Sequence, residues 1–329
     1  MTESLKNRIR ESASAYACGD AIGMPTEFMT LGEIRSKIGT VDRLLPQELS
    51  MNHPDLEPGR VTDDTEQNAY LLEAYRKSGE ITSENTVEAL LRWIDETDAV
   101  NRHYIGPNSK KALEAVKAGA SMETAGTGGT TCGGIMRIPS VTWFDPGAGD
   151  EELSERVLKC LKPTHFTWEA LEAAGAYAFA MREALSGGGE EAVLKAARLG
   201  GRLCSGLAPW QSAAPSSVGR IEFISEYISK GTHDPRELQD MLYSVIGTGL
   251  PSADVCCAVF AIFLTSSGSA WEAVKAGASL GGDTDTIAAL AGALTAAASG
   301  KNDIPEDIRR KVEAENPAVF SKLRYGIGI

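Results

Sequence analysis

EALEAAGAYAFAMREAL, residues 169–185, and IAALAGALTAAASG, residues 287–300, decide the fold class of this chain. Both are rich in alanine, which has the highest helix propensity, and their small side chains let helices approach closely. Helical periodicity is found at 65–78, 86–98, 108–119, 151–161, 168–185, 190–200, 254–266, 269–277 and 285–299. No strand-length alternation of apolar and polar residues recurs. The sequence therefore predicts an all-α protein.

Two segments rich in glycine and proline, 124–150 and 204–220, interrupt this helical pattern. Neither is charged enough or long enough to be a disordered tether between domains. The chain has 329 residues, 43% of them hydrophobic, which is enough for one large core. We therefore expect a single compact multi-helix domain over residues 1–329. In such a domain a long irregular stretch like 124–150 typically lines a ligand site.

The overall charge narrows the possible partners. The formal net charge is -13, and such an acidic surface repels the phosphate backbone of nucleic acids. A small phosphate-bearing substrate stays possible, because a metal can override the overall field. The longest apolar run, 255–264, is too short to span a membrane, and the six cysteines include no C-x-x-C pair. We expect a soluble cytoplasmic protein that binds neither nucleic acid nor membrane; its oligomeric state is open.

The stretch 60–67, RVTDDTEQ, opens the helix predicted at 65–78. Threonine and aspartate are common N-cap residues, so part of this pattern is explained by capping. One cap needs only one side chain, whereas the four consecutive residues of TDDT all carry ligand oxygens. Adjacent carboxylates repel each other, so this concentration indicates a compensating cation.

The stretch 281–286, GGDTDT, opens the alanine-rich helix at 285–299. That helix is almost wholly apolar, so its start is expected to be buried with Asp283 and Asp285. Buried carboxylates without partners cost roughly several kcal/mol, and no lysine or arginine follows before Lys301. Because the ligands are oxygens, with no histidine or cysteine, the cation is expected to be Mg²⁺, Mn²⁺ or Ca²⁺ rather than zinc.

A third acidic stretch, GDAIGMPTE, covers residues 19–27. A helix that ends at a glycine, followed by a turn at Pro25, would place Asp20 and Glu27 on an irregular segment. Taken alone, the stretch is best interpreted as a helix C-cap with solvated carboxylates.

Taken together, GDAIG-x-x-x-E, TDDT and GGDTDT, in this order and in an alanine-rich helical chain, resemble the ADP-ribosylglycohydrolase family. The resemblance extends from Cys18 to about Gly300. The family includes enzymes that remove ADP-ribose from arginine or serine, and the dinitrogen-reductase-activating glycohydrolases. The resemblance implies one all-α domain whose central cleft holds two divalent cations, Mg²⁺ or Mn²⁺. It also implies metal-dependent hydrolysis of an N-glycosidic bond to ribose.

The resemblance assigns roles residue by residue. Glu27 matches the mobile glutamate of the family and is expected, with Asp285, to be catalytic. The implied metal ligands are Thr62, Asp63, Asp64, Asp283, Asp285 and Thr286. The expected substrate-binding residues are Tyr104, Gly133, Gly134, Met136, Arg137 and His165. From the residues alone, Arg137 is explained equally well by a phosphate contact and by a salt bridge.

Two departures from the family pattern lie on the substrate side. Thr131-Cys132-Gly133 stands where the family usually has Gly-Asn-Gly, and Tyr104-Ile105-Gly106 stands where nitrogenase-type members have Asp-Ile-Gly. The metal side is complete. We therefore expect the chemistry to be kept and the substrate preference to be altered.

Three functions are compatible with these observations. The first is removal of ADP-ribose from a modified protein side chain or small molecule. The second is hydrolysis of a smaller nucleoside-like N-riboside. The third, of another class, is a non-catalytic crystallin-like or binding descendant, which the complete set of metal ligands disfavours. His53, His103 and His233 occur in polar stretches and are expected to lie on the surface.

Overall fold

Alanine and glycine at the centre of the chain's longest helices control how this protein is packed. The computed structural model describes residues 2–102, 104–231 and 234–328. Within these residues the regular structure is helical, and no sheet is formed. The α-helices are α1 Glu3–Gly23, α2 Leu31–Lys37, α3 Asp63–Ser78, α4 Ser83–Thr97, α5 Pro107–Lys117, α6 Met122–Ala125, α7 Ile138–Phe144, α8 Asp150–Leu161, α9 Trp168–Leu185, α10 Glu190–Ser205, α11 Ser217–Ser229, α12 Pro235–Met241, α13 Ser252–Thr265, α14 Ala270–Ala278, α15 Thr284–Ser299, α16 Glu306–Glu315 and α17 Pro317–Ile327.

Short irregular helices complete the chain at Met24–Thr26 (η1), Gln47–Leu49 (η2), Gly126–Gly128 (η3), Ile135–Arg137 (η4) and Leu242–Ile246 (η5). The predicted all-α class and single multi-helix domain are confirmed. Membrane spanning would require a length and a hydropathy that none of the described helices combines.

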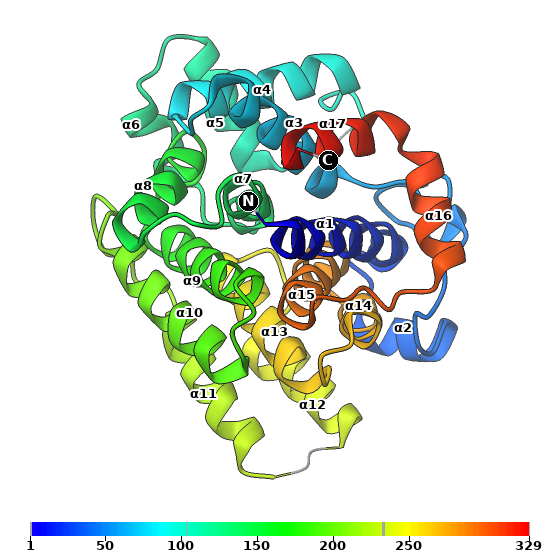
Figure 1. Ribbon diagram of the computed structural model, residues 1–329. Helices are drawn as coiled ribbons and strands as arrows, with labels where there is room; N and C mark the ends of the chain where they lie inside the picture. The colour runs from blue at the N-terminus through cyan, green and yellow to red at the C-terminus, as the bar shows by residue number, and fades with distance from the viewer. Residues whose placement is uncertain (1, 103, 232–233, 329) are drawn as a thin grey trace.

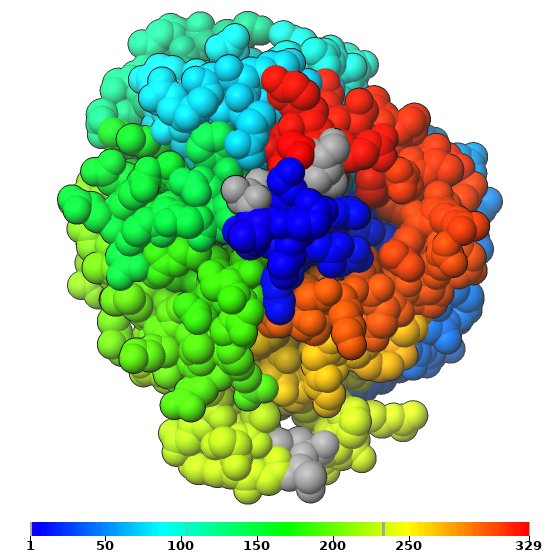
Figure 2. All heavy atoms as spheres, in the orientation of Figure 1, coloured from blue at the N-terminus to red at the C-terminus, as the bar shows by residue number. Residues whose placement is uncertain are grey.

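The helix pair α1 and α15 forms the centre of the molecule (Figure 1). The two helices touch through backbone: a Cβ added to Gly19 would lie 2.5 Å from the carbonyl oxygen of Ala288, and one added to Gly23 would lie 2.4 Å from that of Thr284. Only glycine permits this approach. From Ser12 onward almost all of α1 is buried. The face drawn in Figure 2 shows its blue N-terminal end between green and orange segments.

The segment 124–150 is the main correction to the predicted helix pattern. It contains η4 and a buried helix, α7, whose sequence IPSVTWF has low helix propensity. Packing against α3 and α9 stabilises α7, which local sequence cannot reveal. The short helix α2 was also not predicted, because its seven residues are too few to show a clear apolar period. Both segments predicted to be irregular pack on the one domain.

Candidate active site

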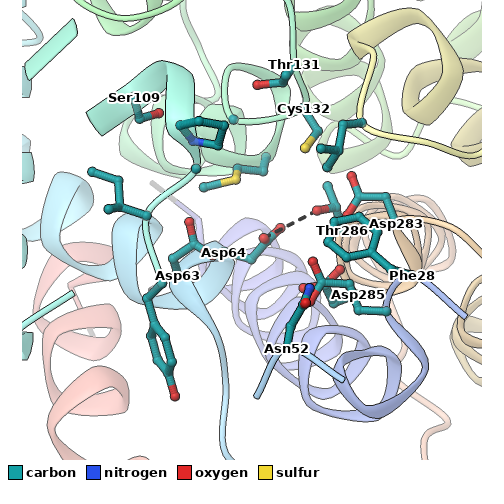
Figure 3. Close-up of a pocket in the computed structure, with 18 of the residues that line it drawn as sticks. Phe28, Asn52, Asp63, Asp64, Ser109, Thr131, Cys132, Asp283, Asp285 and Thr286 are labelled. Atoms are coloured by element: carbon teal, nitrogen blue, oxygen red, sulfur yellow. Dashed lines mark hydrogen bonds between the residues drawn. The ribbon is translucent and has the colours of Figure 1, made fainter. Parts of the chain in front are cut away.

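The starts of α3 and α15 meet in the interior, as Figure 3 shows. Thr62 caps α3, and its hydroxyl accepts a hydrogen bond from the N–H of Asp64 at 3.3 Å. Asp283 occupies the N-cap position of α15, yet its side chain caps no N–H of that helix. The hydroxyl of Thr286 donates to Oδ2 of Asp64 at 3.3 Å and joins the two motifs. The carboxylate of Asp283 is therefore free to face the pocket.

A tight turn places Glu27 beside these carboxylates. Gly281 and Gly282 have φ values of +82° and +84°, and a Cβ on Gly282 would lie 2.1 Å from the carbonyl oxygen of Thr248. The N–H of Phe28 donates to the carbonyl of Gly282 at 2.7 Å, and the N–H of Gly282 donates to that of Met29 at 3.1 Å. Phe28 itself has φ of +61°, a conformation that is costly for a bulky residue and is often found at functional sites.

The pocket that these elements enclose has a volume of about 320 Å³. Several expected site residues line it together: Glu27, Asp63, Asp64, Tyr104, Gly133, Met136, Asp283, Asp285 and Thr286. Other lining residues come from the 50–60 loop, the start of α5 and the glycine-rich loop: Asn52, His53, Ile105, Pro107, Ser109, Thr131 and Cys132. Part of 124–150 thus borders the pocket. Thr62, Gly134, Arg137 and His165 do not line it.

The carboxylates fit a cation. One oxygen each from Glu27, Asp283 and Asp285 lies within 4.8 Å of the others. Oδ2 of Asp283 and Oδ1 of Asp285 are buried and accept no hydrogen bond from the described residues. Burial, followed by repulsion from neighbouring carboxylates, raises the pKa of Asp285 well above its usual range. A buried all-oxygen cluster of this kind suits a hard divalent metal.

The carboxylates at the start of α3 are likewise buried close to other negative charges. Burial and nearby carboxylates raise the pKa values of Asp63 and Asp64 well above the usual range. The Tyr16 hydroxyl lies 2.9 Å from Oδ1 of Asp64, and the amide of Gln67 donates to Oδ2 of Asp63 at 2.9 Å. These hydrogen bonds hold the carboxylates in place without neutralising their charge.

Asp20 was misinterpreted from sequence. It lies inside α1 rather than on an irregular segment, and it is fully buried. Its carboxylate accepts hydrogen bonds from the N–H groups of Thr62 and Thr65 and, at 2.5 Å, from the Thr65 hydroxyl. Burial raises its pKa to about 6. Asp20 therefore fixes the start of α3, and with it the acidic motif, to α1.

His53 is a second correction, because it is buried rather than on the surface. Its Nε2 lies 3.2 Å from Oε2 of Glu27, and its ring packs edge-on against Tyr104 with 4.9 Å between ring centroids. The polar sequence around residue 53 gave no signal of this, because the 50–60 loop folds back over the pocket. His103 and His233 lie outside the described residues.

Arg137 and His165 sit behind the pocket wall. Both are fully buried, and the guanidinium of Arg137 donates to Oγ1 of Thr164 at 2.8 Å and to Oγ of Ser109 at 3.1 Å. Arg137 therefore forms no salt bridge with a described residue, and it does not present both terminal nitrogens to a phosphate in the pocket. Each of these nitrogens donates to a hydroxyl group instead. Tyr104, in contrast, lines the pocket, and its hydroxyl accepts a hydrogen bond from Arg102 at 2.7 Å.

An all-helical domain with acidic helix starts around one pocket has a clear counterpart among known families. The model of the ADP-ribosylglycohydrolase family matches residues 1–324. The chain therefore belongs to the ADP-ribosylglycohydrolase family, and the resemblance noted in the sequence is confirmed.

Several known proteins are similar over nearly their full length. The uncharacterized protein YegU of Escherichia coli is 29% identical over 318 residues, covering 96% of this chain and 94% of YegU. An uncharacterized protein of Archaeoglobus fulgidus is 29% identical over 302 residues, covering 89% and 88%. A solved structure described as an ADP-ribosylglycohydrolase-related protein complex has a TM-score of 0.67 at 23% identity and covers 98% of this chain and 100% of its own. That likeness concerns the fold.

Proposed function

We propose that this protein is a metal-dependent hydrolase that cleaves an N-glycosidic bond to ribose, in an ADP-ribosylated protein side chain or small molecule. The observation that carries the proposal is the meeting of two acidic helix starts in one buried pocket, with carboxylate oxygens that accept no hydrogen bond from the described part of the chain. Membership of the ADP-ribosylglycohydrolase family supports glycosidic bond hydrolysis as the reaction.

The proposed metal ligands are Thr62, Asp63, Asp64, Asp283, Asp285 and Thr286. When bound, two divalent cations, Mg²⁺ or Mn²⁺, supply Lewis acidity and lower the pKa of a water molecule. Glu27 and Asp285 are the proposed catalytic carboxylates, and their oxygens belong to the same close cluster. Either can take a proton from the attacking water or give one to the departing group as the ribose develops oxocarbenium character.

A smaller nucleoside-like riboside is the second candidate substrate. Among the described residues that line the pocket there is no lysine or arginine to pair with a diphosphate. The volume of about 320 Å³ is near the lower end of the range for ligand pockets, roughly 300–1,000 Å³. Phe28, 42% exposed at the edge of the pocket, offers an aromatic face to a planar base.

A side-by-side assay tests the proposal. ADP-ribosyl-arginine, ADP-ribosyl-serine and a panel of nucleosides and nucleotides are incubated with the protein and either Mg²⁺ or Mn²⁺, and free aglycone is quantified. We expect metal-dependent release from at least one riboside and poor turnover of ADP-ribosyl-arginine. Metal-independent turnover would contradict the proposed chemistry. Saturable binding of these compounds without any release would favour the non-catalytic alternative.

A further inference from the structure

The buried guanidinium of Arg137 controls the direction of two hydroxyl groups. Arginine can only donate, so Ser109 and Thr164 must both accept from it. Ser109 lines the pocket, and no described residue accepts a hydrogen bond from the hydroxyl of Ser109. The Ser109 hydroxyl proton is thus directed to whatever occupies the pocket.

The second arm of Arg137 reaches the same pocket through a histidine. Oγ1 of Thr164 lies 2.9 Å from Nδ1 of His165, and Nε2 of His165 lies 3.1 Å from Oγ1 of Thr131. The Thr164 hydroxyl already accepts a hydrogen bond from Arg137, and its remaining neighbour is Nδ1 of His165. The hydroxyl proton of Thr164 is therefore paired only if Nδ1 of His165 is unprotonated and accepts it. The opposite tautomer would leave the buried Thr164 proton without an acceptor, which is costly. Burial and the charge of Arg137 lower the pKa of His165 well below its usual range, so the ring is neutral.

The order of donors is therefore Arg137 to Thr164, Thr164 to Nδ1 of His165, and Nε2–H of His165 to Thr131. Thr131 accepts from His165, and the amide of Asn108 donates to the same oxygen at 3.5 Å. The proton of Thr131 is then free, like that of Ser109. Figure 3 shows Ser109 and Thr131 on one side of the pocket, away from Asp285 and Asn52.

We propose that Ser109 and Thr131 are specificity-determining residues whose hydroxyls donate to oxygen acceptors of the substrate, and that Arg137 and His165 are positioning residues that orient them. The nature of the ligand rests on the proposed ribosyl hydrolase function. A phosphoryl oxygen and a ribose hydroxyl offer the same acceptor chemistry. The carboxylates across the pocket can bind cations or accept protons, whereas the two hydroxyls can donate protons. Each side of the pocket would therefore contact a different part of one ligand.

The backbone keeps this hydroxyl pair in place. The hydroxyl of Ser252 donates to the carbonyl of Thr131 at 2.7 Å, and the N–H of Cys132 donates to that of Leu250 at 2.7 Å. Ser109 stands in the first turn of α5, which has no side-chain cap. These hydrogen bonds fix the two segments within the protein itself, as a preorganised recognition surface requires.

The tautomer of His165 is the first test, and it needs neither substrate nor metal. Nitrogen-15 NMR of the labelled full-length protein reports which ring nitrogen carries the proton. We expect a neutral ring protonated at Nε2 near neutral pH. Thr164→Ser should keep this tautomer, and Thr164→Val should lose it. Protonation at Nδ1, or an imidazolium, would overturn the inference even if the protein hydrolyses ribosides.

Ligand binding is the second test, with AMP and adenosine as probes in the presence of Mg²⁺. Thr131→Val and Ser109→Ala should each weaken binding about tenfold, the value of one hydrogen bond, whereas Thr131→Ser should bind like the wild type. Loss for AMP alone identifies a phosphoryl acceptor, and loss for both probes identifies a ribose hydroxyl. Unchanged binding of both probes overturns the inference. If the wild type binds neither probe, the nucleoside-like substrate candidate is contradicted, and the tautomer of His165 still decides whether Arg137 and His165 orient the two hydroxyls.

Discussion

The two sides of the pocket bury polar groups in opposite ways. The carboxylate side, defined by Glu27, Asp63, Asp64, Asp283 and Asp285, keeps oxygens that no described residue pairs. The hydroxyl side, defined by Ser109, Thr131, Thr164, Arg137 and His165, joins its groups in a continuous chain of hydrogen bonds and leaves the hydroxyl protons of Ser109 and Thr131 for a ligand. The carboxylate side needs a cation to balance its buried charge, whereas the hydroxyl side holds its one buried charge, Arg137, with neutral hydroxyl groups of the protein. Substitutions on the two sides should therefore differ in sign.

The largest expected effect is at Asp285. Asp285→Asn should abolish turnover and remove the stabilisation by Mg²⁺ or Mn²⁺. It should also raise the free energy of unfolding of the metal-free protein by about 1–3 kcal/mol, because an unpaired buried charge disappears. Thermal and urea unfolding with and without chelator measure both effects.

The matched control for Asp285→Asn is Glu306→Gln, which neutralises an exposed carboxylate that pairs with Arg310. It should change stability by less than about 0.5 kcal/mol and leave the metal response intact. If Asp285→Asn destabilises the metal-free protein, then the protein itself stabilises the Asp285 carboxylate, and the carboxylate side does not need a cation.

The next effect is the dependence of metal stabilisation on pH. The pKa values of Asp20 and Asp283 are both raised to about 6, chiefly by burial. A raised folded-state pKa gives stability that is present below the unfolded value of about 4 and is lost as pH rises through about 6. The metal-free protein should therefore lose stability over this window, and a bound cation should offset the loss.

The measurement for this pH effect is the difference in Tm between samples with Mg²⁺ and samples with EDTA. The difference should be small at low pH and should grow as the pH rises past about 6, the value to which burial raises the pKa of Asp283. A difference that is constant across this window would contradict a cation site built from these carboxylates.

A smaller effect is expected on the hydroxyl side. Arg137→Met should lower the free energy of unfolding by about 1–3 kcal/mol, with or without metal, because two buried hydroxyls lose their donor. Arg310→Met, at an exposed arginine, is the control and should change stability by less than about 0.5 kcal/mol. Urea unfolding measures both. If Arg137→Met raises the free energy of unfolding instead, the hydrogen bonds from Arg137 do not stabilise the hydroxyl side.

The smallest effect concerns His53, which contacts the carboxylate side from the 50–60 loop. His53→Phe keeps a ring beside Tyr104 but loses Nε2 near Glu27. A lost hydrogen bond of about 1 kcal/mol corresponds to a roughly fivefold lower kcat. His53→Gln retains a donor and should recover part of the activity. Equal turnover of wild type and both variants would show that His53 does not position Glu27.

Local sequence predicted the carboxylate side of the pocket better than its surroundings. The TDDT and GGDTDT motifs could be found because one short stretch supplies several carboxylate and hydroxyl groups and also opens a helix. Asp20 could not, because its role depends on the N–H groups of Thr62 and Thr65, which a different helix provides. A lone aspartate in a helix has the same local pattern whether it faces solvent or another helix.

The fold shows the same limit. Alanine-rich stretches such as α9 and α15 carry a helical signal in their own composition, and the all-α class followed from them. The helix α7 does not, since Pro139 and the β-branched residues around it form a helix only against α3 and α9. His53 was placed on the surface for the same reason: its burial comes from a loop whose path is set by tertiary contacts.

The hydrogen bond that the Thr284 hydroxyl donates to the carbonyl of Gly23 joins residues 261 positions apart, and it also has a consequence for biosynthesis. A growing chain releases α1 from the ribosome first and α15 only after all the residues between them have been made. Until then the glycine- and alanine-lined face of α1 that packs on α15 is uncovered, and the pocket carboxylates Asp283 and Asp285 do not yet exist. A stalled or truncated product consequently carries an uncovered apolar helix, which quality control recognises, and holds no partial active centre. The site comes into being in a single late step.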